Sequence, residues 1–260
     1  MTLQQSIEVV ADGRLDTNKG ALPMTLEQSI DVVAGGNPDR KAALGDALRR
    51  RILTMQIAPG AVLDEVALSE EFGLSRPPVR ELMRQMAGEG YIDLEANRAA
   101  RVTSMNYHAL RDFFLVAPMI YIATTQLAAE RASKADIDLL KRVQGEFREA
   151  ATHGDVDGRI FSNNEFHLQI GKIARNEYLI PSLRRLLIDH GRIGRTFFRS
   201  DPAARAQLDV AADQHDQIID AIEQHDTNAA ARIVRAHLDL SRRNMAAYAA
   251  PDGMEVPAGI

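Results

Sequence analysis

The sequence predicts a mainly α-helical protein, in which a small helical domain with a β-hairpin precedes an all-α bundle of six to seven helices. Two observations predict this fold. Residues 40–105 combine helical periodicity with two short runs of β-forming residues. From residue 106 onward, apolar residues recur at helical spacing without strand-like alternation, in blocks at roughly 107–132, 134–153, 155–175, 178–198, 204–224 and 226–248.

The first 39 residues contain a near-duplication. Met1–Gly13 recurs as Met24–Gly36 with 10 of 13 positions identical. Two copies are too few for a stacked repeat protein, although each copy has the apolar spacing of a short amphipathic helix. We expect residues 1–39 to be a flexible extension that arose by tandem duplication, and residues 251–260 to be a disordered tail. A partner-binding role for the repeat stays open.

Two helices are predicted before the most informative segment of the chain. Lys41–Met55 has apolar residues at helical spacing and a basic run that includes Arg49, and it stops at a Pro-Gly breaker. Asp64–Phe72 predicts a short second helix, which a Gly-Leu-Ser turn ends.

A third helix follows Ser75, whose hydroxyl we expect to cap it, and Pro77 lies in its first turn. Its apolar stripe, which we expect to be buried, consists of Val79, Leu82, Met83 and Met86. Arg76, Arg80 and Arg84 recur at every fourth residue, on a face about 110° from that stripe. A basic stripe alone is more often a solvated surface. A buried face beside an arginine-rich face near a helix N-terminus is, however, what a helix in the DNA major groove needs.

Two short β-like runs, Tyr91–Leu94 and Arg101–Thr103, come next and are joined by residues 95–100. Three helices followed by a hairpin make a winged helix-turn-helix, in which the hairpin can contact the DNA backbone or minor groove. Arg98 and Arg101 make this wing basic.

The order of these elements strongly resembles the N-terminal domain of GntR-type bacterial regulators. The resemblance covers residues 41–105, and its most specific part is the Ser-Arg-x-Pro-Val-Arg-Glu core at Ser75–Glu81. Val66 stands where many relatives have a basic residue, and Ala99 stands where the wing commonly has glycine. The resemblance places Arg76 and Arg80 on arginines that bind operator DNA. With the basic pattern it gives the expected DNA-binding set Arg49, Ser75, Arg76, Pro77, Arg80, Arg84, Arg98 and Arg101.

Composition agrees with a regulator in the cytoplasm. A chain of 260 residues suggests two domains, and the absence of cysteine suits a reducing compartment. We find no signal peptide pattern and no apolar run near the ~18 residues of a spanning helix, so no membrane partner is expected. The net charge of −5 is uneven, with −4 on residues 1–39, +1 on residues 40–105 and −2 on residues 106–260. A nucleoid-type architectural protein would be far more basic.

Three histidines and one asparagine stand out in the helical part. Asn163 and His167 are four residues apart, on one face of a helix, while His215 and His237 lie in two later helices. Taken singly, each histidine is more often a packing or surface residue than a ligand. The remaining histidines, His108, His153, His190 and His225, show no such spacing.

The helical part, residues 107–248, resembles the FCD effector domain that accompanies this DNA-binding domain in FadR-type regulators. The resemblance implies that Asn163, His167, His215 and His237 bind a divalent metal, for which three imidazoles favour Zn²⁺ or Ni²⁺. Relatives often have aspartate at the position of Asn163. Relatives also carry an arginine on the first bundle helix that is missing here, so we expect the effector to contact residues Tyr121, Arg192 and Arg195.

Together these features predict a dimeric transcriptional regulator, most readily a repressor, that binds palindromic operator DNA and responds to a small carboxylate effector. The alternative is a metal-dependent hydrolase built on a helical bundle. Against it, the sequence has no H-E-x-x-H pattern, no Ser-His-Asp arrangement and no phosphate-binding glycine loop. We therefore expect no enzymatic activity.

Overall fold

A computed structural model describes residues 36–197 and 202–249 of the chain. Residues 1–35 of the expected flexible extension and the expected disordered tail, residues 251–260, lie outside these residues. The last three residues of the expected extension, 37–39, are instead the start of a helix.

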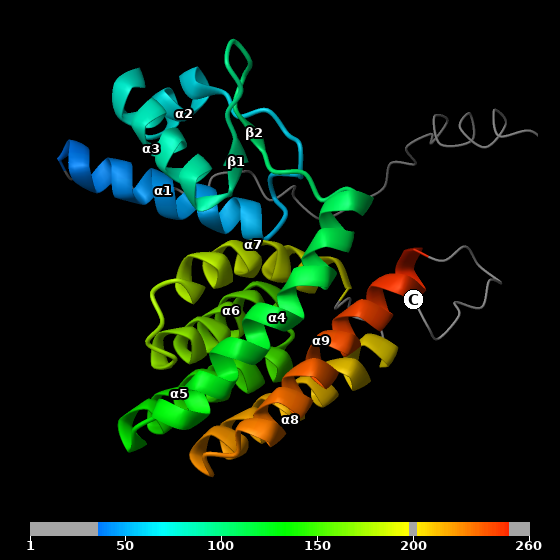
Figure 1. Cartoon of the computed structure of the whole chain (residues 1–260). Coiled ribbons are helices and arrows are strands. Elements are labelled where there is room, and N and C mark those ends of the chain that lie inside the picture. Colours follow the sequence, from blue (N-terminus) through cyan, green and yellow to red (C-terminus); the bar gives the residue numbers. More distant parts are fainter. Residues whose placement is uncertain (1–35, 198–201, 250–260) are drawn as a thin grey trace, which may run out of the picture. The chain divides into compact units, whose positions relative to one another are not determined.

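The N-terminal domain is a winged helix-turn-helix, as predicted (Figure 1). It consists of α1 (Asn37–Leu53), α2 (Glu65–Glu71), α3 (Arg76–Glu89), β1 (Ile92–Asp93) and β2 (Arg101–Val102). The strands are antiparallel, with Ile92 opposite Val102 and Asp93 opposite Arg101, and Val62 forms a further bridge to Arg101. The first helix begins at Asn37, earlier than the predicted Lys41, because proline at the second position is compatible with a helix start.

The core of this domain is made by the predicted apolar stripes. Leu44, Leu48 and Ile52 of α1 pack against the apolar face of α3, with Ile92 and Val102 of the hairpin beside them. The third helix ends at Gly90, whose φ of 90° is a left-handed conformation that glycine adopts without strain.

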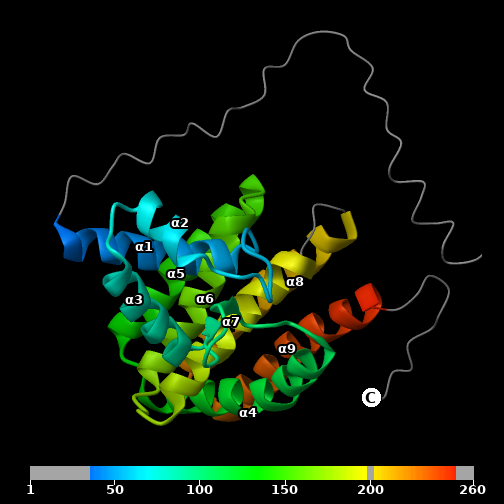
Figure 2. The same cartoon turned by 90° about the horizontal axis from the view of Figure 1, so that it is seen from above.

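The C-terminal domain is an all-α bundle, also as predicted (Figures 1 and 2). Among the described residues its helices are α4 (Tyr107–Arg131), α5 (Lys134–His153), α6 (Val156–Ile173), α7 (Leu179–Phe197), α8 (Pro202–Glu223) and α9 (Thr227–Ala249). Their bounds fall within a few residues of the periodic blocks in the sequence. The reason is that strong N-cap residues, such as Asn106 and Ser133, start the helices, and Gly154 ends α5.

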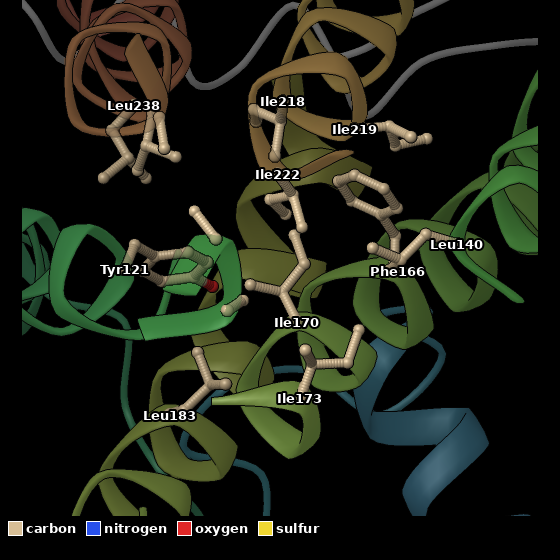
Figure 3. Close-up of a cluster of buried hydrophobic side chains, with 14 of the residues drawn as sticks. Tyr121, Leu140, Phe166, Ile170, Ile173, Leu183, Ile218, Ile219, Ile222 and Leu238 are labelled. Atoms are coloured by element: carbon tan, nitrogen blue, oxygen red, sulfur yellow. The ribbon is translucent and has the colours of Figure 1, made fainter. Parts of the chain in front are cut away.

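Branched aliphatic side chains fill the bundle core, as the low aromatic content required. Figure 3 shows Ile170 and Ile173 of α6 facing isoleucines of α8, such as Ile222, with Tyr121 of α4 close by. These side chains are at most 3% exposed, so they are packed in the interior of the bundle.

The helix α4 is long and apolar. In the part of the chain that the structure describes, it alone is long and apolar enough to cross a membrane by length and composition, although the sequence has no uninterrupted apolar run of that length. The core helix of a bundle passes the same test. α4 packs against α6 and α9 through buried residues such as Ala117 and Ala128.

The winged domain and the bundle share contacts through α1 and α7. Leu53, Ile160 and Ile188 form a small buried cluster, and the guanidinium of Arg50 lies 4.4 Å from the ring centre of Phe161. Gly191 lets α7 lie close to Leu53 of α1, since a Cβ at this position would lie 3.3 Å from Leu53 Cδ2.

Candidate functional sites: a DNA-binding face and a histidine cavity

The arginine face of α3 is exposed, as a DNA-contacting surface requires. The side chains of Arg76 and Arg80 are 56% and 49% exposed. Glu65, at the first position of α2, holds both: its Oε2 lies 2.7 Å from Arg80 Nε and 3.5 Å from Arg76 Nη2. The two guanidinium groups are therefore oriented before DNA arrives, by an acidic residue that sequence reasoning missed. Its place on a different helix gave no spacing signal.

Ser75 occupies the predicted N-cap position of α3, but its hydroxyl makes no capping hydrogen bond. The physical reason is the sequence that follows it. A capping oxygen accepts from the second or third backbone N–H of the helix, and those positions are Pro77 and Pro78, which have none. The exposed Ser75 hydroxyl therefore keeps its hydrogen-bonding capacity, and contacts from this helix end depend mainly on side chains.

Ala99, which stands where the wing commonly has glycine, does not adopt a positive φ. The positive φ of the wing turn falls on Asn97, at 60°, and asparagine tolerates this conformation better than alanine does. Arg98 pairs with Glu95 and remains 72% exposed, so it can still meet a phosphate. Arg101 donates to the carbonyl of Gly60 at 3.0 Å, which fixes the base of the wing.

The predicted role of Arg49 in DNA binding loses its geometric support. Its Nε and Nη2 each lie 3.0 Å from one carboxylate oxygen of Glu89, so two parallel hydrogen bonds occupy the planar fork. This pair connects α1 to the C-terminal end of α3. Arg84, by contrast, is exposed on α3. The DNA contacts of Arg84, Arg98 and Arg101 stay predictions.

Replacing Glu65 by glutamine should increase affinity for mixed-sequence DNA by at least threefold and lower the ratio of specific to non-specific binding. The carboxylate of Glu65 neutralises positive charge of Arg76 and Arg80 that DNA phosphates would otherwise contact. It also fixes the orientation of these two side chains. One additional phosphate contact should steepen the salt dependence by about 0.9. Fluorescence anisotropy at several salt concentrations measures both effects. Glu70→Gln, an equal charge change on the exposed side of the same helix, is the control; equal non-specific affinities for the two variants would contradict the orienting role.

The histidines of the bundle meet in its interior. His167 of α6, His190 of α7 and His237 of α9 place ring nitrogens within 4.8 Å of one another, and all three are buried. His215 of α8 joins them, with its ring centre 5.3 Å from that of His167 and 4.8 Å from that of His237. The structure therefore brings together the three predicted histidines and adds His190, which sequence spacing had set aside.

Glutamine side chains orient two of these rings. Gln144 donates to the carbonyl of Ala212 at 2.8 Å, so its amide oxygen faces Nδ1 of His215 at 3.0 Å. Because an amide oxygen only accepts, Nδ1 carries the proton and Nε2 of His215 keeps a lone pair. Gln214 Oε1 holds Nδ1 of His237 in the same way at 3.1 Å. The buried Nε2 atoms of His167 and His215 have no hydrogen-bond partner.

These rings are neutral at physiological pH, since burial lowers the pKa of each. The pKa of His190 falls to about 4 and that of His237 to about 3, and those of His167 and His215 lie well below the ordinary value. Neutral imidazoles with bare nitrogens are metal ligands, and buried nitrogens without a partner are costly unless something binds them. The donor set thus fits a borderline divalent cation such as Zn²⁺ or Ni²⁺.

A cavity of about 30 Å³ adjoins the histidines and has Asn163, His190 and His237 in its wall. This is about the volume of one water molecule in the liquid, so the cavity holds an ion or a water but no organic acid. A much larger hollow, of about 1230 Å³, lies elsewhere, between α1, α5, α6 and α7. It is open and lined by charges of both signs, and the four clustered histidines do not line it.

The residues predicted for effector binding have different surroundings. The hydroxyl of Tyr121 lies 2.8 Å from Nδ1 of His190, at the centre of the cluster. Arg192 is fully buried, and it donates to the carbonyl and hydroxyl oxygens of Thr103 at 2.8 Å each and to Asp189 at 2.6 Å. Neither Arg192 nor Arg195 lines the cavity, so the geometry does not support their predicted contact with an effector.

The arginine in the cavity wall is Arg159 of α6, which sequence reasoning missed. It is buried, and burial lowers the pKa of its guanidinium. A signal was present, because Arg159, Asn163 and His167 follow one another at intervals of four residues and so share a helix face. For His190 the signal was its place on the apolar stripe of α7, four residues after the buried Leu186.

The exposed arginine face of α3 and the basic wing beside it are the features of a DNA-binding protein, and here they are joined to a helical bundle. Comparison with known families agrees. Residues 40–102 match the "bacterial regulatory proteins, gntR family", and residues 119–240 match the FCD domain. The chain belongs to the GntR family of transcriptional regulators, and it carries an FCD domain.

Curated relatives are of the same kind. The HTH-type transcriptional repressor RspR of Escherichia coli is 26% identical over 191 residues, which are 74% of this chain and 82% of that protein. A probable D-xylose utilization operon transcriptional repressor of Paenarthrobacter nicotinovorans is 28% identical over 197 residues, 73% of this chain and 83% of that one. Among solved structures, E. coli McbR/YncC has the same fold, with a TM-score of 0.67 at 18% identity over 80% of this chain and 96% of that chain.

Proposed function

We propose that this regulator is a metal-assisted repressor, whose affinity for operator DNA changes when a small carboxylate binds in the histidine cavity. The observation that carries the proposal is the cavity of about 30 Å³, whose wall includes Arg159, His190 and His237. The neutral imidazoles of His167 and His215 lie directly beside it, against the ring of His237. A metal ion would supply positive charge at this point, and Arg159 adds more. Among the described residues no Asp or Glu lines the cavity, so a hydrolase would lack a general base there. The protein would act in the cytoplasm, where the DNA is.

The helix α7 supports coupling between the cavity and the DNA-binding domain. His190 lies at the cavity, and Arg192, two residues later, is bonded to Thr103 directly after β2. A shift of α7 therefore moves groups at the base of the wing. An effector changes DNA affinity only by as much as it binds the two arrangements differently, typically 1–3 kcal/mol.

A carboxylate larger than a water molecule requires the cavity to open. The wall opposite α6 is lined by small or aliphatic side chains of α8 and α9, among them Leu208, Ala211 and Leu240. We infer that the effector binds an opened form of the bundle, and that this opening is the movement which α7 transmits.

Two protomers are needed to contact a palindromic operator, because each winged domain covers one half-site. The exposed face of α4 suits contact between them. Leu115 and Met119, four residues apart, are each 68% exposed, and Val116 lies between them. Apolar side chains at this spacing favour packing against an identical helix of a second copy.

The test is an operator titration with a panel of small hydroxy- and dicarboxylic acids, using the metal-loaded protein. We expect two protomers per palindromic fragment and an acid that weakens binding five- to 150-fold. Arg159→Lys should weaken the response to that acid at least tenfold and leave operator affinity without acid unchanged, because lysine cannot form a bidentate pair with a carboxylate. Arg195→Lys, which lies outside the cavity, is the control. An equal response of both variants would place the effector elsewhere.

A further inference from the structure

We propose that His190 is a ligand of the bound metal ion, and that it completes a four-imidazole site with His167, His215 and His237 in which Asn163 is not required. This inference rests on the proposed function, in which the bundle holds a divalent ion. It differs from the ligand set that the sequence resemblance implied, where Asn163 supplied the fourth donor.

The spacing of the rings carries the inference. An ion about 2.1 Å from each ring nitrogen holds tetrahedrally arranged imidazole centres about 5 Å apart. The ring centre of His190 lies 5.1 Å from that of His167 and 6.3 Å from that of His237. The centres of His167 and His237 are 5.3 Å apart. Small side-chain rotations therefore bring all three rings to one ion.

We assign His215 to the same ion, which requires its ring to move toward the three histidines whose nitrogens lie within 4.8 Å of one another. Its ring centre is 4.8 Å from that of His237 and 5.3 Å from that of His167, within the range expected for neighbouring ligands. Its Nε2 is buried without a partner, and the hydrogen bond to Gln144 directs this nitrogen's lone pair away from the amide.

Tyr121 orients the ring of His190 through a hydrogen bond, as Gln144 and Gln214 orient the rings of His215 and His237. Its hydroxyl lies 2.8 Å from Nδ1 of His190, and its ring meets the rings of His190 and His167 edge-on. A phenol oxygen can accept the Nδ1 proton, which leaves Nε2 of His190 with the lone pair that an ion needs. This arrangement makes Tyr121 a positioning residue for the site.

Asn163 is the weaker candidate for the fourth donor. It lies in the cavity wall but is only partly buried, and its neutral amide oxygen is a poorer donor to Zn²⁺ or Ni²⁺ than an imidazole nitrogen. Each of the four histidines comes from a different helix, from α6 to α9 in order. An ion bound by all four therefore ties these helices together, including α7, which contacts the winged domain.

The experiment loads metal-stripped protein with Co²⁺ and compares His190→Gln with Asn163→Ala. For the wild type we expect one ion per chain and the intense visible absorption of four-coordinate Co²⁺. His190→Gln should weaken Co²⁺ at least tenfold and change that spectrum, and it should reduce the metal-induced rise in Tm. Asn163→Ala should keep the affinity within threefold and the spectrum unchanged. Tyr121→Phe, a milder change, should weaken Co²⁺ less than His190→Gln does.

X-ray absorption of the Zn²⁺-loaded wild type counts imidazoles directly, so it decides the point even if His190→Gln does not fold. Four imidazoles support the proposal, whereas three imidazoles with an oxygen that disappears in Asn163→Ala overturn it. If the wild type binds Co²⁺ and His190→Gln has the same affinity and spectrum, the assignment of His190 as a ligand is also overturned. The proposed function is then unaffected. A wild type that binds no ion overturns the metal part of the proposed function as well.

Discussion

Arg80→Ala should lower affinity for the operator by roughly five- to 150-fold, which corresponds to about 1–3 kcal/mol, and should blur the preference at one base pair. The planar fork of arginine can bond to O6 and N7 of a guanine at once, and alanine replaces neither bond. The side chain of Arg80 is 49% exposed, so its pair with Glu65 contributes little to folding. The loss should therefore appear in DNA binding and not in the unfolding midpoint.

The matched control for Arg80→Ala is Arg148→Ala in the bundle. Arg148 is similarly exposed, at 43%, and is likewise ion-paired, to Asp213 and Asp216, so its removal changes the net charge equally. We expect Arg148→Ala to leave operator affinity within twofold of the wild type. Titration of both variants against the operator and against single-base variants of it measures affinity and preference together. If Arg80→Ala binds the operator as tightly as Arg148→Ala does, α3 does not contact the bases.

The fold was predictable because local sequence determines it. The apolar stripe of α3 at Val79, Leu82 and Met86 is buried as its spacing predicts, and the six bundle helices follow the six periodic blocks. The hairpin was predicted as well, but the conformation of its turn was not. The positive φ falls on Asn97. A sequence shows which residues tolerate a positive φ, but it does not show which of them adopts it.

The sites were predictable only where one helix carries the whole pattern. Arg76 and Arg80 share a helix, and so do Asn163 and His167, and periodicity identifies both pairs. Contacts between helices have no such spacing. Glu65 therefore went unnoticed beside the arginines. His190 was set aside for lack of spacing, although the structure places its ring 5.1 Å from that of His167. For the same reason Arg192, which we expected to contact the effector, is bonded to Thr103, and their separation of 89 residues in sequence gave no sign of this contact.

Metal-free protein should lose several kcal/mol of its unfolding free energy as the pH falls from 7.5 to 5. Burial lowers the pKa of His190 to about 4 and of His237 to about 3, while in the unfolded chain each titrates near 6.5. Below pH 6.5 the unfolded chain therefore binds protons that the folded protein does not, and this favours unfolding. Each such group removes about 1.4 kcal/mol per pH unit until the pH reaches its folded pKa.

The histidine contribution is thus fully present above pH 6.5, and it is lost progressively toward pH 4 for His190 and pH 3 for His237. His167 and His215, with their lowered pKa values, act in the same direction. Most carboxylates titrate below pH 5, so the interval from 6.5 to 5 isolates the histidines. Urea unfolding across this interval measures the loss. His190→Gln should reduce the pH dependence of the unfolding free energy by about one proton. A midpoint that stays constant from pH 7.5 to 5 would mean that the buried rings take up protons in the folded state, and a dry cavity of neutral ligands would be excluded.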